Sequence, residues 1–374
     1  VLEIVEMPSH ITRRKLMTTK WVFKLKTDEF GKISKYKARL VLQGFRQIED
    51  IDYDKFGVFA PTCRAESIRA ALTIGAMYDM EILQYDIPAA FLRSDLDVEM
   101  YVKPPDGMNL KPNQVLKLRK SLYGLVQSPR LFYNYAEETL NKCGFYATNA
   151  DPCLFINECK NNSRPPMIIC VYVDDLILIG RACDINPTIA FLKKEFDISV
   201  LGDLNWYLGM KIIRNRKLKQ IKLHQEQYIK SALDRYKLAG DKVVSYSTPT
   251  IAGQKLFKFE GPNDKERTAL YQSMIGTLIY LSTHTRPDIC YAVHNCARWM
   301  SNPSKEHLNA AKRILRYLKE TKTYGIVLGG GDPILTCFVD SAYATDEERR
   351  RSTTGFVVYL GTSPISWSST LQKS

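Results

Sequence analysis

The sequence contains no apolar stretch long enough to cross a membrane. A spanning helix needs about 20 predominantly apolar residues, and the longest apolar stretch, Met167 to Ile179, is interrupted by Asp174 and Asp175. The first ten residues, VLEIVEMPSH, have neither the basic start nor the apolar centre of a secretory signal peptide. We therefore expect an intracellular protein with no membrane partner. Because the first residue is Val rather than Met, we also expect the chain to be part of a longer protein.

Cysteine and histidine are too few and too scattered to indicate a disulfide or zinc framework. The chain has 9 cysteines and 5 histidines, and no two cysteines show CxxC spacing. Dispersed thiols in odd number favour reduced cysteines in a reducing compartment. A weaker zinc hypothesis rests on Cys290 and His294, at positions i and i+4, with His284 upstream. A packed helix face explains this spacing equally well, because four apolar residues share it: Ile289, Val293, Ala297 and Met300.

Repeats and low-complexity segments are absent as well, whereas positive charge is abundant. The 53 Lys and Arg residues exceed the 40 Asp and Glu residues, which gives a net charge of +13 over 374 residues. Hydrophobic residues make up 45%, so a large core must form. At roughly 150 residues per domain, the length suggests two or three domains. With membranes excluded, the excess charge indicates a nucleic acid as the polyanionic partner.

Periodicity predicts a mixture of helices and strands. Alternating residues predict a basic hairpin from Trp21–Lys26 and Ile33–Leu42, joined by a turn at Thr27–Lys32. A helix over Ala65–Tyr78 then leads into a short strand, Met80–Asp86. Further along we predict four helices: one within Leu122–Leu140, and others at Ile189–Phe196, Leu270–Leu281 and Ser304–Glu320. We also predict a second basic hairpin at Met210–Leu223 and short strands from Ile334. A linker is predicted at Ser247–Gly261.

The most distinctive segment places two carboxylates at a predicted hairpin tip. The apolar runs Met167–Val173 and Leu176–Ile179 flank Asp174 and Asp175. Adjacent like charges repel and Asp-Asp is not a favoured hairpin turn, although a plain solvated turn is the alternative. A divalent cation such as Mg²⁺ would remove the repulsion. Asp86 closes a second short strand, and carboxylates at two neighbouring strand ends can hold two metals for nucleotidyl transfer.

Several segments, in this order, resemble the reverse transcriptases of Ty1/copia-type LTR retrotransposons. Three resemble core motifs of that family: YDIPAAFLRSDL, SLYGLVQSPRLFY and VYVDDLILIG. KWVFKLKTDEFGKISKYKARLVLQGF resembles the fingers, LGDLNWYLGMKI resembles the primer grip, and YQSMIGTLIYLSTHTRPDICYAV with HLNAAKRILRYLK resembles the segments joining polymerase to ribonuclease H. The resemblance implies an α+β right-hand polymerase, with fingers and palm over residues 1–200, thumb and connection helices over 201–330, and a truncated ribonuclease H-like sheet over 331–374.

The same resemblance implies the catalytic residues. Asp86, Asp174 and Asp175 would be the catalytic carboxylates, and they would hold two Mg²⁺ ions with help from the backbone carbonyl of Ile87. Mn²⁺ is the alternative cation. Phe91 would lie under the sugar and act as a steric gate against ribonucleotides. Without the resemblance, a core aromatic on a helix face is the simpler interpretation of Phe91.

Further residues are implied to contact the substrates. Lys37 and Arg39 share parity on the second strand of the first hairpin, so both project from one face. They could be solvated edge charges, but the resemblance favours contacts to the incoming triphosphate. The motif SLYGLVQSP implies four more positions: Tyr123 and Gly124 would lie near the incoming nucleotide, and Gln127 and Ser128 near the template.

One departure from the family and two basic segments affect the expected nucleic-acid surface. Val126 stands where the family usually has a basic residue, which removes electrostatic help to the template strand. The hairpin at Lys211–Lys222 and the helix face at Lys312–Lys319 are rich in cations. They could be solvated surface, but their positive bias favours contact with a duplex backbone.

The C-terminal segment resembles only the opening strands of a ribonuclease H domain. Asp340 stands where the first metal-binding carboxylate of that domain would be, as a vestigial ligand. The further carboxylates are missing, and about 40 residues cannot bury a core of their own. We therefore expect no ribonuclease H activity, and a nuclease or integrase centred on Asp340 fails for the same reason.

Together these features predict an RNA-directed and DNA-directed DNA polymerase. Its expected partners are an RNA template, a DNA primer, RNA–DNA duplex, dNTPs, and the integrase, protease and Gag parts of a retrotransposon polyprotein. The expected location is the cytoplasmic virus-like particle, with the nucleus as an alternative. The competing hypothesis is a truncated, catalytically inactive remnant that only binds nucleic acid.

Overall fold

The computed structural model describes residues 1–11, 15–27, 33–157, 165–346 and 350–373. Contacts divide the chain into two compact units. The first consists of Val1–Cys63, Gln84–Leu178 and Ala182–Gly202, and the second of Arg64–Leu83, Ile179–Arg181 and Asp203–Ser374. These units are defined by compactness, whereas the expected fingers, thumb and ribonuclease H segments are defined by resemblance to a family. The boundaries of the expected segments therefore stay a prediction.

The first unit begins with two small antiparallel sheets. Strand β1 (Leu2–Glu6) pairs with β6 (Gln114–Lys120), which also pairs with β5 (Asp95–Val102). Strands β2 (Thr19–Thr27) and β3 (Ile33–Leu42) form a separate hairpin, in which Val22 lies opposite Arg39. The predicted basic hairpin is therefore confirmed, except that residues 28–32 of its expected turn lie outside the described residues.

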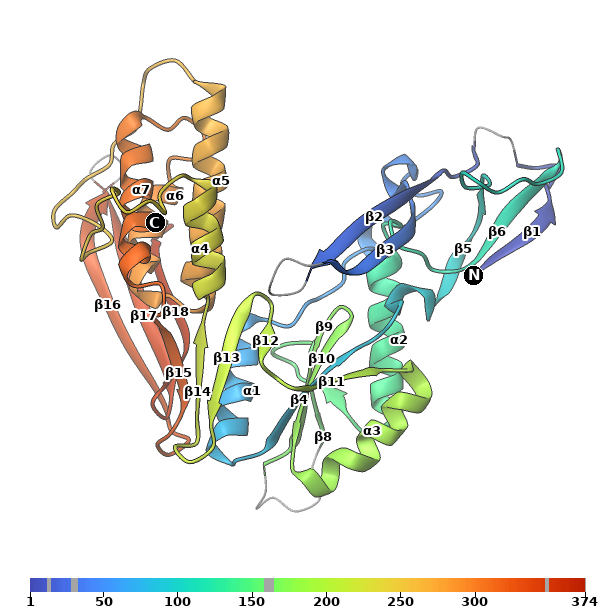
Figure 1. The fold of residues 1–374 in the computed structure, drawn as a ribbon, viewed down its shortest axis with the longest axis horizontal. Helices are drawn as coiled ribbons and strands as arrows, with labels where there is room; N and C mark the ends of the chain where they lie inside the picture. Colours follow the sequence, from blue (N-terminus) through green and yellow to red (C-terminus); the bar gives the residue numbers. More distant parts are fainter. Residues whose placement is uncertain (12–14, 28–32, 158–164, 347–349, 374) are drawn as a thin grey trace. The chain divides into compact units, whose positions relative to one another are not determined.

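A six-stranded sheet carries the acidic strand ends (Figure 1). Its order is β11-β4-β10-β9-β8-β7, so β10 lies between β4 and β9. The strands are β4 (Glu81–Asp86), β7 (Tyr146–Ala147), β8 (Leu154–Asn157), β9 (Met167–Tyr172), β10 (Asp175–Gly180) and β11 (Ser199–Asp203). Helices α2 (Ser128–Lys142) and α3 (Ala182–Phe196) belong to the same unit. The predicted hairpin around Asp174 and Asp175 is confirmed.

The second unit contains most of the helices. Helices α4 (Glu226–Arg235), α5 (Lys265–His284), α6 (Cys290–Ala297) and α7 (Lys305–Glu320) share one buried apolar cluster. A four-stranded sheet has the order β12-β13-β14-β15, formed by Trp206–Tyr207, Met210–Asn215, Gln220–His224 and Gly325–Gly329. The predicted helices at Leu270–Leu281 and Ser304–Glu320 are confirmed, and Ser304 is the N-cap of α7.

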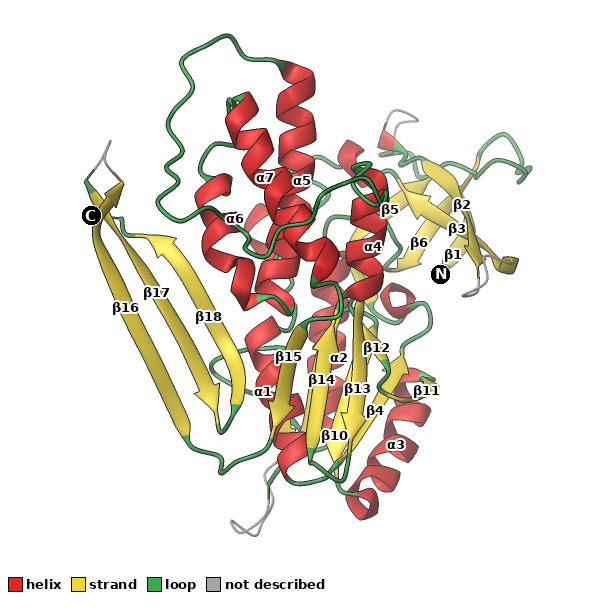
Figure 2. Cartoon of the chain, turned by 60° about the vertical axis from the view of Figure 1, so that its left-hand side comes forward, coloured by secondary structure: helices red, strands yellow, loops and turns green. Residues whose placement is uncertain are grey.

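Three long antiparallel strands form the C-terminal sheet (Figure 2): β16 (Leu335–Asp346), β17 (Arg351–Leu360) and β18 (Ser363–Leu371). Helix α1 (Ala65–Met77) packs against β14, β15 and β18. Arg69, on α1, donates to the carbonyl oxygens of Ile365 at 2.7 Å and Thr283 at 2.8 Å, and its guanidinium lies 4.1 Å from the ring centre of Trp367. The C-terminal strands thus share a core with α1 instead of standing alone.

The mixture of helices and sheets confirms the expected α+β class. Ser247–Gly261 contains no regular element, as predicted, but both ends of this segment belong to the second unit. The cysteines within the described residues are free thiols. Among the described residues, no helix combines the length and apolarity that a membrane span requires.

Candidate active site

The turn between β9 and β10 presents the two adjacent carboxylates. Strand β9 ends at Tyr172 and β10 starts at Asp175, so Val173 and Asp174 form a two-residue turn. Val173 has a φ of +56°, in the left-handed region that β-branched residues rarely adopt. Such a residue costs of order 1–3 kcal/mol, and similar strain clusters at functional sites. The backbone is therefore held in a costly conformation at the position that sets the direction of Asp174.

A backbone hydrogen bond joins this turn to the other acidic strand end. The N–H of Ile87 donates to the carbonyl oxygen of Asp174 at 2.8 Å. Ile87 directly follows Asp86, the last residue of β4, and its own side chain is buried. Because β10 lies next to β4 in the sheet, this bond fixes the ends of neighbouring strands together. The structure thus brings Asp86, Asp174 and Asp175 to one edge, as the sequence predicts.

The electrostatics of the three carboxylates show an excess of negative charge. Burial raises the pKa of Asp175, and the negative charges of Asp174 and Asp86 raise it further. A side-chain hydrogen bond with Gln84 works in the opposite direction and lowers that pKa without reversing the shift. The net upward shift means that the folded site disfavours a third negative charge. Gln84 was not singled out from the sequence, because an alternating strand residue carries no local sign of this role.

The donor set suits a hard divalent cation. Mg²⁺ is typically bound by one or two carboxylates and completes its shell with water and substrate phosphates. Asp86 and Asp174 are half-buried oxygen donors on tied strand ends. Among the described residues, no group of three or more His, Cys, Asp or Glu side chains is arranged to hold a metal. The oxygen donors of Asp86 and Asp174 are of the type that Mg²⁺ prefers, and water and substrate phosphates would have to supply its other ligands.

Arg39, Tyr123 and Phe91 lie together in the first unit. The guanidinium of Arg39 lies 5.2 Å from the ring centre of Tyr123, a cation–π contact. The rings of Tyr123 and Phe91 have centroids 4.6 Å apart, and Phe91 also contacts Phe132 edge-on at 6.2 Å. Burial raises the pKa of the Tyr123 hydroxyl, and the charges of Asp174 and Asp86 raise it further while that of Arg39 lowers it. These side chains are therefore electrostatic neighbours of the carboxylates.

Lys37 lies on β3 two positions from Arg39 and is half-buried. Lys24 stands directly opposite it on β2, and Val22 stands opposite Arg39. Directly opposed like charges destabilise a two-stranded ribbon. The register thus places two cations opposite each other on this hairpin.

Gly124 makes a close backbone approach, but to the protein itself. It has a φ of +99°, and a Cβ at this position would lie 2.0 Å from the carbonyl oxygen of Leu42. A Cβ on Gly44 would in turn lie 1.9 Å from the carbonyl oxygen of Gly124. The N–H of Leu42 donates to the carbonyl oxygen of Tyr123 at 2.8 Å. Because Gly124 has no Cβ, the end of β3 can pack directly against the loop that carries Tyr123. A larger residue at this position would clash with the backbone of Leu42.

The Gln127 side chain is buried and bonded within the protein. Its Nε2 donates to the carbonyl oxygen of Asp52 at 3.0 Å, and its Oε1 accepts from Gln47 Nε2 at 2.9 Å. Gln47 Oε1 also accepts from the N–H of Val126 at 2.8 Å. Ser128 is buried too and donates to the carbonyl oxygen of Leu122 at 2.6 Å. These contacts hold the loop after β3, so a template contact by Gln127 stays a prediction, and Gln47 is a partner that the sequence did not reveal.

The basic face of α7 is covered by a segment of the same unit. Arg313 lies 4.1 Å from the ring centre of Tyr246 and donates to Thr248 Oγ1 at 3.0 Å. Lys319 Nζ donates to the carbonyl oxygens of Gly240 at 2.9 Å and Val243 at 3.0 Å. These internal contacts occupy part of the basic face, whose cations stay half-exposed, so duplex contact by α7 stays a prediction. They hold the irregular segment that precedes α5, and the periodicity of α7 could not reveal that cover.

The second basic hairpin is partly neutralised. Arg214 pairs with Asp79 at 3.0 Å, and Arg216 pairs with Asp79 at 3.2 Å and also with Glu81. Three lysines of the hairpin remain exposed: Lys217, Lys219 and Lys222. Contact with a nucleic-acid backbone therefore stays a prediction that rests on these lysines.

The zinc alternative finds no support among the described residues. His294 Nε2 accepts a hydrogen bond from the N–H of Leu371 at 3.2 Å. Ile289 and Val293 are buried in the helical cluster, and Ala297 and Met300 pack against it, which confirms the core interpretation. Asp340 lies exposed on β16 opposite Gly355, where its Oδ1 accepts from the N–H of Ser341 at 2.8 Å.

Comparisons with known proteins identify the family of this chain. The model of a family described as reverse transcriptase (RNA-dependent DNA polymerase) matches residues 1–252. The Retrovirus-related Pol polyprotein from transposon TNT 1-94 of Nicotiana tabacum is 38% identical over 379 residues, which cover 99% of this chain and 28% of that protein. A transposon Ty5-1 protein of Saccharomyces cerevisiae is 32% identical over 76% of this chain and 91% of its own length.

One similar solved structure is that of the foamy viral protease-reverse transcriptase in complex with ds DNA. The two chains share 13% sequence identity and superpose with a TM-score of 0.45, over 98% of this chain and 53% of the viral chain. The chain spans about a quarter of the length of the tobacco polyprotein. The resemblance to Ty1/copia-type retrotransposon proteins is confirmed by the transposon relatives. The chain belongs to the reverse transcriptase (RNA-dependent DNA polymerase) family.

Proposed function

We propose that this chain extends a DNA primer on RNA and DNA templates, by transferring a nucleotidyl group from a dNTP to the primer 3′-hydroxyl. The single observation that carries the proposal is the convergence of Asp86, Asp174 and Asp175 at tied strand ends, with a raised pKa at Asp175. The negative charges of Asp174 and Asp86 add to the effect of burial in raising the pKa of Asp175, which suits a site that binds external cations.

Asp86 and Asp174 would hold two divalent ions, with Mg²⁺ as the first choice and Mn²⁺ as the alternative. Such ions, when bound, lower the pKa of the primer 3′-hydroxyl and neutralise charge on the leaving pyrophosphate. The chain's own residues position the reactants. The turn at Val173 orients Asp174, and the hydrogen bond from Ile87 keeps the two strand ends at a fixed spacing.

Arg39 and Lys37 bind the triphosphate in this proposal. Arg39 is already oriented by its contact with Tyr123, so its planar guanidinium loses little freedom on binding a phosphate. Phe91 packs on Tyr123, and a bulky ring fixed from one side excludes a sugar 2′-hydroxyl by its volume. The aromatic pair therefore couples the triphosphate contact to the choice of deoxyribose.

The partners follow from family membership and charge. We propose an RNA template, a DNA primer and their duplex as nucleic-acid partners, and the remaining segments of a longer polyprotein as protein partners. The exposed lysines of the second basic hairpin supply phosphate contacts that position a duplex without reading its sequence. We further propose that synthesis takes place in cytoplasmic particles, which cell fractionation with antibodies to this chain would test.

Primer extension on an RNA template with the purified chain tests the proposal. The Asp174→Asn variant keeps the size of the side chain but removes its charge, and we expect extension to fall at least a thousandfold. Asp340→Asn is the matched control, since this exposed carboxylate lies on β16 outside the site. Duplex binding without extension by the unmodified chain would instead support an inactive remnant.

A further inference from the structure

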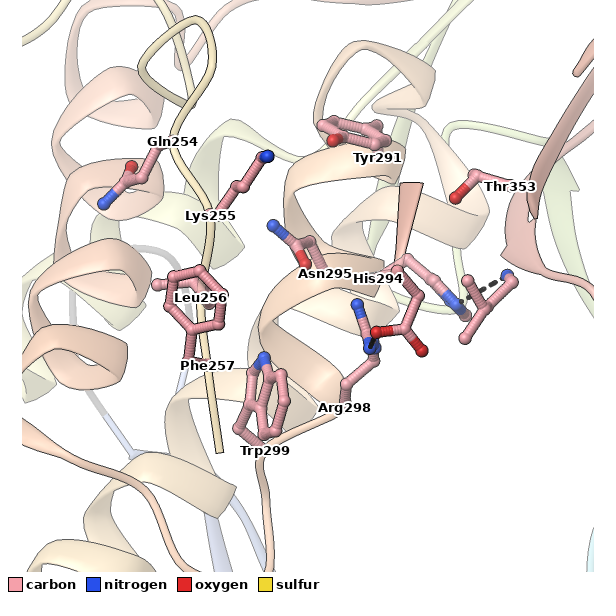
Figure 3. A pocket seen from close by; sticks show the side chains of 12 residues that line it. Gln254, Lys255, Leu256, Phe257, Tyr291, His294, Asn295, Arg298, Trp299 and Thr353 are labelled. Atoms are coloured by element: carbon pink, nitrogen blue, oxygen red, sulfur yellow. Dashed lines mark hydrogen bonds and ion pairs between the residues drawn. The ribbon is translucent and has the colours of Figure 1, made fainter. Parts of the chain in front are cut away.

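A cavity of about 70 Å³ in the second unit has no part in the proposed polymerase site. Figure 3 shows its walls: Leu256 and Phe257 lie on an extended segment, and Tyr291, His294 and Asn295 face them from α6. Arg298 and Trp299 follow α6, and strands β16 and β18 add Asp346 and Leu371. Its volume suits one edge of a planar ring. We refer to it as the Asp346 pocket.

Two buried polar atoms of this pocket have unmet hydrogen-bonding capacity. The Asp346 side chain is only 5% exposed. Its Oδ1 accepts from Arg298 Nη2 at 2.8 Å, but its Oδ2 is buried and finds no partner among the described residues. Trp299 Nε1 is likewise buried, with no hydrogen-bond partner in the described part of the chain. Asp346 and Trp299 both line this cavity, and each of their buried, unbonded atoms costs free energy until a partner reaches it.

The remaining groups of the pocket leave it close to electrical neutrality. Arg298 is paired with Asp346, and its guanidinium lies 5.1 Å from the ring centre of Trp299. His294 Nε2 accepts a hydrogen bond from Leu371, so its proton belongs on Nδ1 and the imidazole is neutral. Burial lowers the pKa of His294, and the charge of Arg298 lowers it further. The pocket therefore suits an uncharged group that offers an N–H beside an acceptor.

The rim adds aromatic surface and one cation. Tyr291 and Phe257 are 50% and 57% exposed, so their rings are available to a flat ligand. Lys255, also at the rim, is exposed and brings positive charge. Aromatic rings stack on nucleobases without strong sequence preference, and a nearby cation attracts the attached phosphate.

We propose that the Asp346 pocket binds the heterocyclic base of a nucleotide, a second nucleotide site that rests on the proposed nucleic-acid function. An N–H of the base donates to Asp346 Oδ2, and the Trp299 indole N–H donates to a ring nitrogen or carbonyl of the base. Tyr291 or Phe257 stacks on the ring. The base comes either from a free nucleotide or from an unpaired position of a strand.

Binding of adenosine 5′-monophosphate to the full chain, in EDTA to suppress metal-dependent binding at the carboxylates, tests the inference. Ribose 5-phosphate is the ligand control. Trp299→Phe keeps an aromatic ring and removes only the N–H, and we expect it to weaken binding about tenfold. Asp346→Asn should weaken it at least as much. Trp21→Phe, on β2 of the other unit, is the matched control and should change nothing.

The source of the base is resolved by comparing an eight-nucleotide deoxyadenosine strand with an abasic strand of equal length. If the unmodified chain prefers the base-containing strand and Trp299→Phe loses this preference, the pocket binds a base of a strand. If Trp299→Phe weakens only the binding of adenosine 5′-monophosphate, the pocket binds free nucleotides. Equal binding of ribose 5-phosphate, or unchanged binding of both base-containing ligands by Trp299→Phe, overturns the inference. Primer extension by Trp299→Phe separates the pocket proposal from the polymerase proposal. If this variant still extends a primer and still binds the nucleotide unchanged, only the pocket proposal is overturned.

Discussion

Two clusters of charged side chains, one in each unit, are built in opposite ways. In the second unit, Arg286 donates to Asp288 Oδ1 at 2.9 Å and Oδ2 at 2.7 Å, and to the carbonyl and hydroxyl oxygens of Thr321. The Tyr317 hydroxyl also donates to Asp288 at 2.7 Å. Burial raises the pKa of Asp288, but the hydrogen bonds and charge of Arg286 outweigh it, and the net pKa is lowered.

The acidic strand ends of the first unit show the reverse pattern. There, burial and two neighbouring carboxylates raise the pKa of Asp175. A cluster that satisfies its own charges stabilises the fold, whereas one that leaves like charges together is suited to bind something from outside. The contrast is consistent with a structural role for the Arg286 cluster and supports the proposed cation site at the three aspartates.

The largest effect on stability is expected at the satisfied cluster. Arg286→Met removes a guanidinium that is 1% exposed, together with its hydrogen bonds to Asp288 and Thr321. Because Asp288 itself is 36% exposed, we expect the low end of the cost of breaking a buried pair, about 3 kcal/mol of unfolding free energy. Urea unfolding measures this loss. The matched control is Arg216→Met, because this partly exposed arginine pairs with Asp79 and Glu81 at the surface and should cost less than about 1 kcal/mol. Equal losses in both variants would remove the distinction between the clusters.

A smaller loss is expected at the junction between β3 and the Tyr123 loop. Gly124→Ala introduces a Cβ that would lie 2.0 Å from the Leu42 carbonyl oxygen, at a φ of +99°. We expect a loss of about 2 kcal/mol from steric strain, together with weaker nucleotide binding because Arg39 and Tyr123 shift. Gly107→Ala is the control, since a Cβ there meets nothing within 4 Å although its φ is also positive. If both substitutions lower the unfolding free energy equally, the positive φ of Gly124, and not its contact with Leu42, explains why glycine is needed there.

The smallest effect should have the opposite sign. Because the folded-state pKa of Asp175 is raised, its carboxyl favours the folded state most when protonated, and that contribution is lost as pH rises through the folded pKa. Asp175→Asn, measured in EDTA, should therefore stabilise the chain at neutral pH by less than about 1 kcal/mol. The gain should disappear as pH falls toward the ordinary aspartate value of 3.8. A variant less stable than the unmodified chain at pH 7 would show that the carboxylate is already compensated.

The sequence predicted the elements that depend on local patterns. Apolar runs on both sides of Asp174 and Asp175 define the hairpin, and the helical spacing before Asp86 defines α1 and β4. The parity of Lys37 and Arg39 likewise follows from alternation along one strand. These features were predictable because residues close in sequence determine them.

Long-range partners were not predictable from the same patterns. Nothing near Gly124 indicates that Leu42 lies against it, and nothing near Gln127 indicates Gln47 and Asp52. The cover over the cations of α7 comes from a segment about 70 positions away in sequence, with Arg313 bonded to Thr248 at a separation of 65 residues. Tertiary contacts of this kind give surface cations partners within the protein, which the periodicity of α7 alone could not reveal.

A magnesium titration followed by thermal melting tests most directly whether the aspartate cluster awaits a cation. A ligand that binds only the folded state at 100 times its dissociation constant adds about 2.7 kcal/mol of stability. We expect the melting temperature of the unmodified chain to rise by a few degrees and then saturate, Asp174→Asn to lose this rise, and Asp340→Asn to keep it. The same rise in all three proteins, or none in the unmodified chain, would contradict the assignment of Asp86 and Asp174 as the cation site.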